Sequence, residues 1–298
     1  MFLEVKNYYN KNFKANYDAI ETIDNNVRRL LARNPSPFTF YGTGTYIIGK
    51  DELAIIDPGP LEEKHIEKLL NIIRKATKVK LLITHTHADH SPAAMVIKEN
   101  IECTTFGFGP YKRKKFDTRF EEGHDLTFKP DVYLNDGDTV KGKGWTIRAI
   151  HTPGHTSNHM CYGLEENKIL FTGDHVMGWA TTVIVPPDGN MTAYLKSLKK
   201  IINYKYEIFY PTHGGPITKP KKFVKALIAH RLMRQTQIKN ELSKNQSTIK
   251  EMVSKFYKTT DKRLWPAAEK SILANLLSLK DKGVVIDENN EQVRWKLI

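Results

Sequence analysis

The chain has 298 residues, of which 40% are hydrophobic and 10% aromatic, enough to bury one large core or two smaller ones. Its 46 basic and 33 acidic residues give a net charge of +13, which favours anionic partners such as nucleic acid. Two cysteines exclude a disulfide framework, and no apolar run reaches the roughly 20 residues of a membrane helix.

The positive charge has a second interpretation. Only 11 of the 46 basic residues are arginines, although arginine recognises phosphate better than lysine does. A lysine-rich and asparagine-rich chain can also reflect codon usage. Charge alone therefore indicates non-specific attraction to anions and does not define a binding site.

Composition and the N-terminal residues predict where the protein works. Residues 1–7 lack the basic region and the apolar region of a secretory signal, and two cysteines agree with a reducing compartment. We expect a cytoplasmic protein with no membrane partner, and an oligomer is possible.

The first predicted elements lie before a stretch of histidine and aspartate residues at 85–90. Residues 1–34 are weakly patterned and end in 27–31, predicted as the first strand. Residues 38–48 and 53–56 predict two more strands, the second short and buried. Apolar positions at helical spacing predict an amphipathic helix over 61–74. We interpret His65, on this helix, as a surface histidine.

The next apolar run, 81–83, ends in four side chains of metal-ligand type, spaced H-x-H-x-D-H: His85, His87, Asp89 and His90. Histidine nitrogens and aspartate oxygens are zinc ligands. The run predicts a buried strand, so these side chains follow at its end. The alternative is a solvated loop that happens to contain histidines.

Ser91 and Pro92 then predict the capped start of a helix, and 101–108 returns to strand character. In the loop 109–130, Tyr111 to Phe116 places four basic residues between two aromatic ones, with Phe120 and His124 following. Such a loop could stack a base and hold phosphate. The alternative is a charged loop exposed beside the site.

Three later residues repeat the arrangement of strand, turn and ligand. His155, Asp174 and His213 each follow an apolar strand and a short turn with glycine or proline nearby. This shared placement is the strongest evidence in the sequence for a metal site. His151, His159 and His175 lie beside these positions, where each could donate a hydrogen bond or be structural.

Strands and helices alternate twice before residue 220, which suits two packed sheets with helices outside, including one predicted over 191–202. Beyond it, three helices are predicted over 223–242, 249–257 and 267–280, then two short strands. This order resembles a winged helix, a fold that binds nucleic acid or serves as a packing or dimerisation element. We predict domains over 1–219 and 220–298.

The ligand segments, with Asp57-Pro58-Gly59 upstream, resemble the metallo-β-lactamase superfamily over residues 38–220. Within it, the chain is most similar to the branch of the mitochondrial β-lactamase-like endoribonuclease and its bacterial relatives. The stretches that carry this similarity are 57–59, 152–155, 159–160, 181–183 and the C-terminal extension. The resemblance implies an αββα sandwich with a winged-helix-like domain.

The resemblance also implies the ligand set. His85, His87 and His155 would hold one zinc ion, Asp89, His90 and His213 a second, and Asp174 would bridge them. Two zinc ions can activate a shared water as a nucleophile near neutral pH. Asp57 would support the ligand loops. Asp89 and His159 are predicted as catalytic, and His159 and His124 are the candidates for the general acid.

Three functions follow as hypotheses. The first is a phosphodiesterase, specifically an endoribonuclease acting on single-stranded RNA. The second is a hydrolase of a small thioester, lactone or β-lactam, as in glyoxalase II-like relatives. The third is a non-enzymatic nucleic-acid-binding module with structural zinc, which a complete seven-ligand set disfavours. Flavodiiron relatives have a carboxylate where this chain has His87, which disfavours a diiron redox role.

Overall fold

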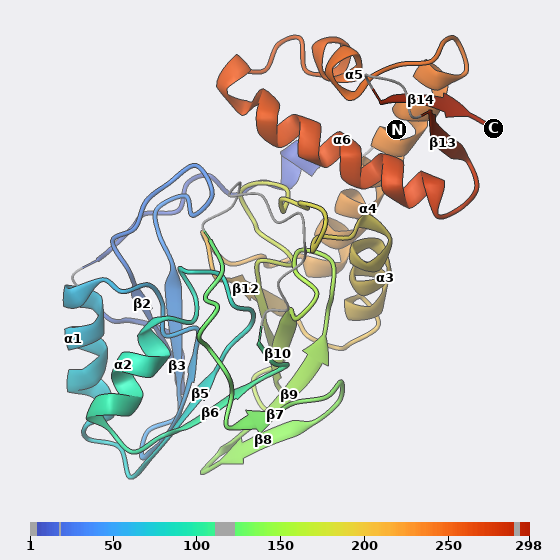
Figure 1. Cartoon of the computed structure of the whole chain (residues 1–298). Helices are drawn as coiled ribbons and strands as arrows, with labels where there is room; N and C mark the ends of the chain where they lie inside the picture. Colours follow the sequence, from blue (N-terminus) through green and yellow to red (C-terminus); the bar gives the residue numbers. More distant parts are fainter. Residues whose placement is uncertain (1–4, 18, 111–122, 289–292) are drawn as a thin grey trace.

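The computed structural model describes residues 5–17, 19–110, 123–288 and 293–298, and its larger part is a four-layer sandwich (Figure 1). Two sheets face each other in the middle and helices cover both outer faces. A helical unit with a small β-hairpin follows at the C-terminal end. The predicted αββα fold with a winged-helix-like domain is confirmed.

The first sheet has seven strands in chain order. Strands β1 to β4 pair antiparallel, and β4 to β7 pair parallel. The strands are β1 (Glu21–Asp24), β2 (Val27–Leu31), β3 (Gly44–Ile48), β4 (Glu52–Ile56), β5 (Lys78–Leu82), β6 (Thr104–Gly107) and β7 (Val132–Tyr133).

The second sheet has five strands in the order β12-β11-β10-β9-β8, with only β11 and β12 parallel. A tight hairpin joins β10 to β11. The strands are β8 (Thr139–Gly142), β9 (Trp145–His151), β10 (Met160–Leu164), β11 (Ile169–Gly173) and β12 (Ile208–Pro211).

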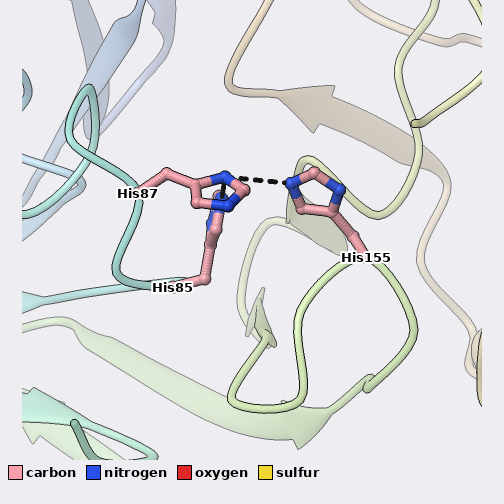
Figure 2. Close-up of side chains that lie close together, drawn as sticks. All are labelled: His85, His87 and His155. Carbon is pink, nitrogen blue, oxygen red and sulfur yellow. Dashed lines mark hydrogen bonds between the residues drawn. The ribbon is translucent and has the colours of Figure 1, made fainter. Parts of the chain in front are cut away.

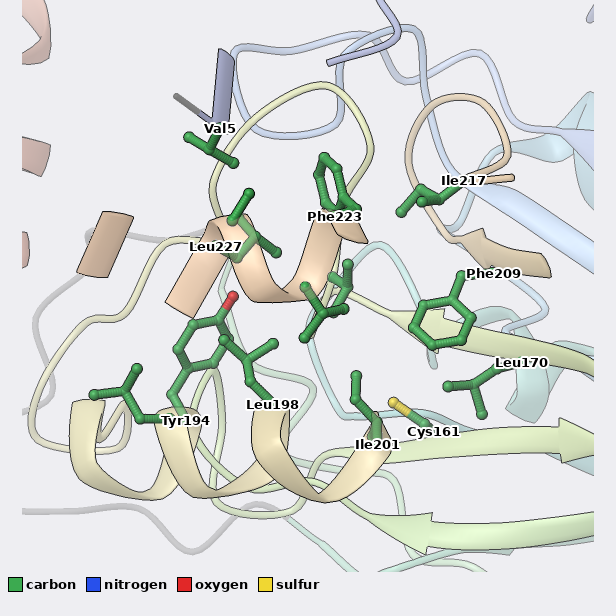
Figure 3. Close-up of a cluster of buried hydrophobic side chains, with 14 of the residues drawn as sticks. Val5, Cys161, Leu170, Tyr194, Leu198, Ile201, Phe209, Ile217, Phe223 and Leu227 are labelled. Atoms are coloured by element: carbon green, nitrogen blue, oxygen red, sulfur yellow. The ribbon is translucent and has the colours of Figure 1, made fainter. Parts of the chain in front are cut away.

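Three apolar cores hold the four layers together. Tyr46 and Ile56 of the first sheet meet Ile147 and Tyr162 of the second between the sheets. Helices α1 (Glu63–Ile73) and α2 (Ala93–Asn100) cover the outer face of the first sheet. Helix α3 (Met191–Ile201) and the start of α4 (Pro220–Leu242) cover the second sheet, and Figure 3 shows this core, with Cys161 among its side chains.

Helix α4 takes part in two cores. Phe223 and Leu227 pack into the core over the second sheet, whereas Ile238 and Leu242 pack into the C-terminal core. That fourth core is completed by α5 (Ile249–Phe256), α6 (Trp265–Lys280) and the antiparallel pair β13 (Val285–Glu288) and β14 (Arg294–Leu297). The predicted boundary between residues 219 and 220 stays a prediction.

The described residues also form two short 3-10 helices, η1 (Val5–Tyr8) and η2 (Lys262–Leu264). Among the helices in the described ranges, none is both long and apolar enough to cross a membrane. Thr248 and Glu251 form a reciprocal capping box at the start of α5.

Two local predictions were wrong. Residues 27–31 form the second strand, since β1 precedes them; β1 is a short polar edge strand, and its partial exposure leaves no alternating apolar signal. Ser91 does not cap α2, because Pro92 occupies the cap position without a side-chain bond. The Ser91 hydroxyl instead donates to Asp125 at 2.8 Å.

The prediction that His65 is a surface histidine was also wrong. Its side chain is 2% exposed, because α1 turns it toward the loop that follows β4. Its Nε2 lies 2.9 Å from the Thr45 hydroxyl and 3.0 Å from the Pro58 carbonyl oxygen. His65 therefore connects α1 to the loop that contains Asp57.

This burial predicts a pH-dependent contribution to stability. Burial lowers the pKa of His65 to about 4, so its stabilising contribution is complete above the ordinary value near 6.5 and is lost as the pH falls through about 4. Between those limits we expect the wild type to lose about 3 kcal/mol more of its free energy of unfolding than His65→Gln. Urea unfolding of both proteins from pH 7 to pH 4 measures this. Parallel pH curves would contradict it.

Candidate metal centre

The seven predicted ligands converge at one end of the two sheets. Four of them, His85, His87, Asp89 and His90, lie in the loop after β5. The other three follow β9, β11 and β12 of the second sheet: His155, Asp174 and His213. All seven are at least 90% buried. The sandwich therefore brings together residues that are up to 128 positions apart (213 minus 85).

The first group consists of three histidines. His85 Nε2 lies 2.9 Å from His87 Nδ1, and His155 Nε2 lies 3.2 Å from the same atom. Figure 2 shows the three rings turned toward one point, from loops of the two different sheets. Three histidine nitrogens around one point form a set that zinc accepts with a further position open.

The second group consists of Asp89, His90 and His213. Asp89 Oδ2 lies 3.2 Å from His90 Nε2 and 3.2 Å from His213 Nε2. His90 Nε2 is buried without a hydrogen-bond partner, although two carboxylates lie near it. Nitrogen and oxygen donors that approach without hydrogen-bond geometry fit a shared cation.

Asp174 lies between the two groups. Its Oδ1 is 3.3 Å from His213 Nε2 and 3.7 Å from His90 Nε2, and its Oδ2 is 3.8 Å from His155 Nε2. The two oxygens of one carboxylate thus face different groups. This is the placement expected of a bridging ligand, and the role itself stays a prediction.

The ring nitrogens on the far side are held by hydrogen bonds. Nδ1–H of His90 donates to Asp57 at 2.8 Å, that of His155 to the Val183 carbonyl at 2.7 Å, and that of His213 to the Gly42 carbonyl at 3.1 Å. Each bond leaves Nε2 as the lone-pair donor. The orientation of all three rings therefore fits metal binding.

The electrostatics of the site point the same way. Burial lowers the pKa of His85 well below its ordinary value, with the neighbouring histidines adding to this effect. At His213 burial opposes the charge, but Asp174 and Asp89 outweigh it and raise its pKa to about 10. Carboxylates and imidazoles buried together require compensating charge, which divalent cations would supply. The residues present therefore fit a metal pair.

Asp57 supports the ligand loops. Its carboxylate accepts hydrogen bonds from the Thr84 amide at 2.8 Å, the Thr84 hydroxyl at 2.8 Å, the Thr212 hydroxyl at 3.1 Å and His90. One side chain thus joins the loops after β4, β5 and β12. This geometry agrees with the supporting role preferred from the sequence.

We expect Asp57→Asn to weaken zinc binding by about 10- to 100-fold, because His90 would lose its charged acceptor. Asparagine tolerates the positive φ of 50° at this position. Competition with a chelator of known affinity measures the change, and Asp51→Asn, which removes a surface carboxylate paired with Lys143, is the matched control. Equal affinities in all three proteins would refute this role.

The environment of His159 does not support the predicted acid role. The side chain is fully buried, its Nδ1–H donates to Thr152 and its Nε2 accepts from the Asp174 amide at 3.2 Å. Burial also lowers its pKa well below the ordinary value. A ring with both nitrogens engaged in this way positions Asp174, and the catalytic role of His159 stays a prediction.

His124 remains the candidate general acid. It is partly exposed, forms a β-bridge with His87, and its ring centroid lies 4.8 Å from that of His87. The neighbouring residues 111–122 lie outside the described part of the chain. The interpretation of that stretch as a loop for bases and phosphate therefore stays a prediction.

Three threonines of the site were missed by the sequence analysis. The Thr43 hydroxyl donates to Asp89 at 3.1 Å, that of Thr84 lies 3.0 Å from His85 Nδ1, and that of Thr182 donates to the Asp174 carbonyl at 2.8 Å. Position next to a ligand could have indicated Thr84. Thr182 lies in the stretch 181–183 that carries the family resemblance, which could have indicated it, whereas Thr43 approaches Asp89 only through the folding of distant loops.

Fold and site together define a class of protein: an αββα sandwich with a histidine- and aspartate-rich metal centre at one end of its sheets. The family description "Metallo-beta-lactamase superfamily" matches residues 39–213, and "Beta-lactamase associated winged helix domain" matches residues 248–295. The chain belongs to the metallo-β-lactamase superfamily of hydrolases. The resemblance stated from the sequence is confirmed at this level, and the narrower branch stays a prediction.

Relatives agree with this assignment. The chain is 31% identical over 277 residues to a "Beta-lactamase-like protein 2 homolog" of Drosophila melanogaster, covering 89% of this chain and 91% of the relative. It is 31% identical over 253 residues to "Atrochrysone carboxyl ACP thioesterase nsrC" of Aspergillus novofumigatus, covering 79% and 72%. A metallo-β-lactamase family protein of Thermus thermophilus shares the fold with a TM-score of 0.75 at 20% identity, covering 93% and 100%.

Proposed function

We propose that the chain is a zinc-dependent hydrolase and that its substrate is single-stranded RNA, cleaved at a phosphodiester. The observation that carries the hydrolase part is the placement of Asp174 between two buried donor groups. Zinc ions held there would activate water and neutralise developing negative charge. No serine or cysteine nucleophile is then required.

The residues of the chain have separate tasks in this proposal. His85, His87 and His155 would hold one ion, and Asp89, His90 and His213 the other. Asp57, Thr84 and Val183 fix the ring orientations through their hydrogen bonds. His124 would deliver a proton to the leaving oxygen, since it is partly exposed beside His87.

Charge supports an RNA substrate. The net charge of +13 attracts a polyanion, and a winged-helix unit is a common nucleic-acid-binding module. The names of several relatives support a second candidate, hydrolysis of an acyl thioester, because they are called carboxyl ACP thioesterases. Both reactions use an activated water and an anionic leaving group.

A substrate panel on the zinc-loaded protein distinguishes the two candidates. It contains a labelled single-stranded RNA, an acyl-coenzyme A, a lactone and a β-lactam, with Asp89→Ala as the inactive control. Endonucleolytic cleavage of RNA that weakens steeply with added salt supports the proposal. Turnover of the thioester without RNA cleavage selects the second candidate and overturns the first.

A further inference from the structure

A cavity of about 670 Å³ lies between the sandwich and the C-terminal helices. One wall is the segment Thr181 to Val183, and α4 contributes Arg231. The opposite wall comes from the turn after α5 and the start of α6, with Tyr257, Arg263 and Leu264 among its residues. The cavity is thus mostly apolar, and its charged lining consists of the Arg231 guanidinium and the ion pair of Arg263 with Asp261.

Arg231 is a buried cation without an anionic partner. It is 5% exposed, and within the described part of the chain no carboxylate lies within ion-pair distance of it. Its Nη2 donates to the Thr182 carbonyl, whereas its Nε is buried without an acceptor. Its guanidinium carbon lies 5.3 Å from the centroid of the Tyr194 ring, a contact that supplies no full negative charge.

The other buried arginine among the described residues shows the contrast. Arg29 is also 5% exposed, but its guanidinium pairs with the carboxylate of Glu21. A buried guanidinium costs stability unless it is paired and hydrogen-bonded. The environment of Arg231 is therefore typical of a residue that pairs with an anionic group of a bound ligand.

The Tyr9 phenol does not supply the missing anion. Burial raises the pKa of Tyr9 to about 12 even though Arg231 opposes the shift, so this phenol is neutral at physiological pH. Burial, together with Arg231 and Arg234, lowers the pKa of His230 to about 4. Neither Tyr9 nor His230 therefore supplies a negative charge to Arg231.

The segment that Arg231 contacts also touches two predicted metal ligands. Thr182 accepts from Arg231 through its carbonyl and donates to the Asp174 carbonyl through its hydroxyl. The next residue, Val183, accepts from Nδ1 of His155. The cavity and the candidate metal centre thus share the segment Thr182 to Val183 as a common wall.

We propose that Arg231 binds a phosphate group of the substrate that the reaction does not cleave. The proposal rests on the hydrolase function proposed above and names the chemistry of one substrate-binding position. A guanidinium matches phosphate through paired N–H donors. The phosphate has two possible sources, a neighbouring phosphodiester of RNA or the phosphate of a phosphopantetheine-type acyl carrier.

Arg231→Gln tests the position, with Arg234→Gln as the matched control. Arg234 lies three residues along α4, loses the same charge, and donates to Gln237 on its own helix. The substrates are a labelled single-stranded RNA, an acyl-coenzyme A, and an acyl N-acetylcysteamine thioester that lacks phosphate. We expect Arg231→Gln to raise KM for the phosphate-bearing substrate by about tenfold with kcat nearly unchanged.

The effect on each substrate identifies the source of the phosphate. A KM increase confined to RNA, with a salt slope reduced by about 0.7, assigns a phosphodiester. An increase confined to acyl-coenzyme A assigns the carrier phosphate. An equal loss on the phosphate-free thioester, or an equal loss in Arg234→Gln, shows a structural role and overturns the proposal.

Two further measurements keep the test decisive. If Arg231→Gln does not fold, Arg231→Lys replaces it, because lysine retains the charge. We expect Arg231→Lys to raise KM less than tenfold, and on the phosphate-bearing substrate only. An equal effect on the phosphate-free thioester overturns the proposal. Binding of the labelled RNA and of desulfo-coenzyme A to zinc-loaded protein needs no turnover. Weaker binding in the Arg231 variants alone supports the anion site, whether or not the wild type hydrolyses either substrate. If the wild type hydrolyses neither substrate, only the proposed function is overturned.

Discussion

Asp89→Asn is expected to abolish hydrolysis, with a fall in kcat/KM of at least about 100-fold. Loss of a residue that only supports a metal ligand already costs up to about 100-fold, and Asp89 is predicted to be a ligand itself. Asp89 Oδ2 is the atom toward which His90 and His213 both point. Asparagine keeps the shape of the side chain, so the fold is retained while the charge is lost. Steady-state kinetics and the zinc content per chain measure the two effects together.

Asp131→Asn is the matched control for this variant. It removes one carboxylate that bonds Lys98 and Thr105 on the outer side of the first sheet, and we expect its activity and zinc content to equal those of the wild type. Asp89→Asn with wild-type kcat/KM would show that the second donor group takes no part in the reaction.

Removal of metal is expected to have the second largest effect. Chelation should eliminate activity, and zinc at about a thousandfold over its Kd should add about 4 kcal/mol to the stability of the metal-free protein. This corresponds to an increase in Tm on the order of 8 °C. The physical reason is that Asp89, Asp174 and five histidines are buried together, so the cations replace an array of charges that would otherwise require protonation.

Thermal melts of chelated and zinc-loaded protein measure this increase, and assays before and after zinc is restored measure activity. In Asp89→Asn the zinc-dependent rise in Tm should be smaller, because one donor group is incomplete. Full activity after exhaustive chelation, verified by metal analysis, would contradict a metal-dependent reaction.

The sequence predicted which seven side chains converge, because these residues lie where a local signal changes, and their role as metal ligands stays a prediction. Apolar strands end shortly before His85, Asp174 and His213, and the carboxyl ends of strands are where loops place functional side chains. Helix limits were also close: 61–74 was predicted for α1, which spans Glu63–Ile73. These features depend on residues adjacent in the chain.

Features that depend on distant residues were not predictable in this way. His65 has the same helical context as a surface residue, and its burial results from contact with Thr45 and Pro58. His159 lies close to the predicted ligand His155 in the chain. Its Nε2, however, accepts a hydrogen bond from the amide of Asp174, which follows the neighbouring strand β11. Arg231 is one basic residue among many on α4, and its burial involves contacts with Thr182 and Tyr194, which lie far from it in the chain.

The continuity of helix α4 affects the width of the cavity beside Arg231. It is continuous from Pro220 to Leu242, and its two halves are anchored in different cores, with Arg231 between them. A second link, between the hydroxyls of Thr192 on α3 and Ser278 on α6 at 2.8 Å, fixes the same junction. One continuous helix and one hydroxyl pair thus hold together the two walls of the cavity beside Arg231, so its width depends on the packing of both cores.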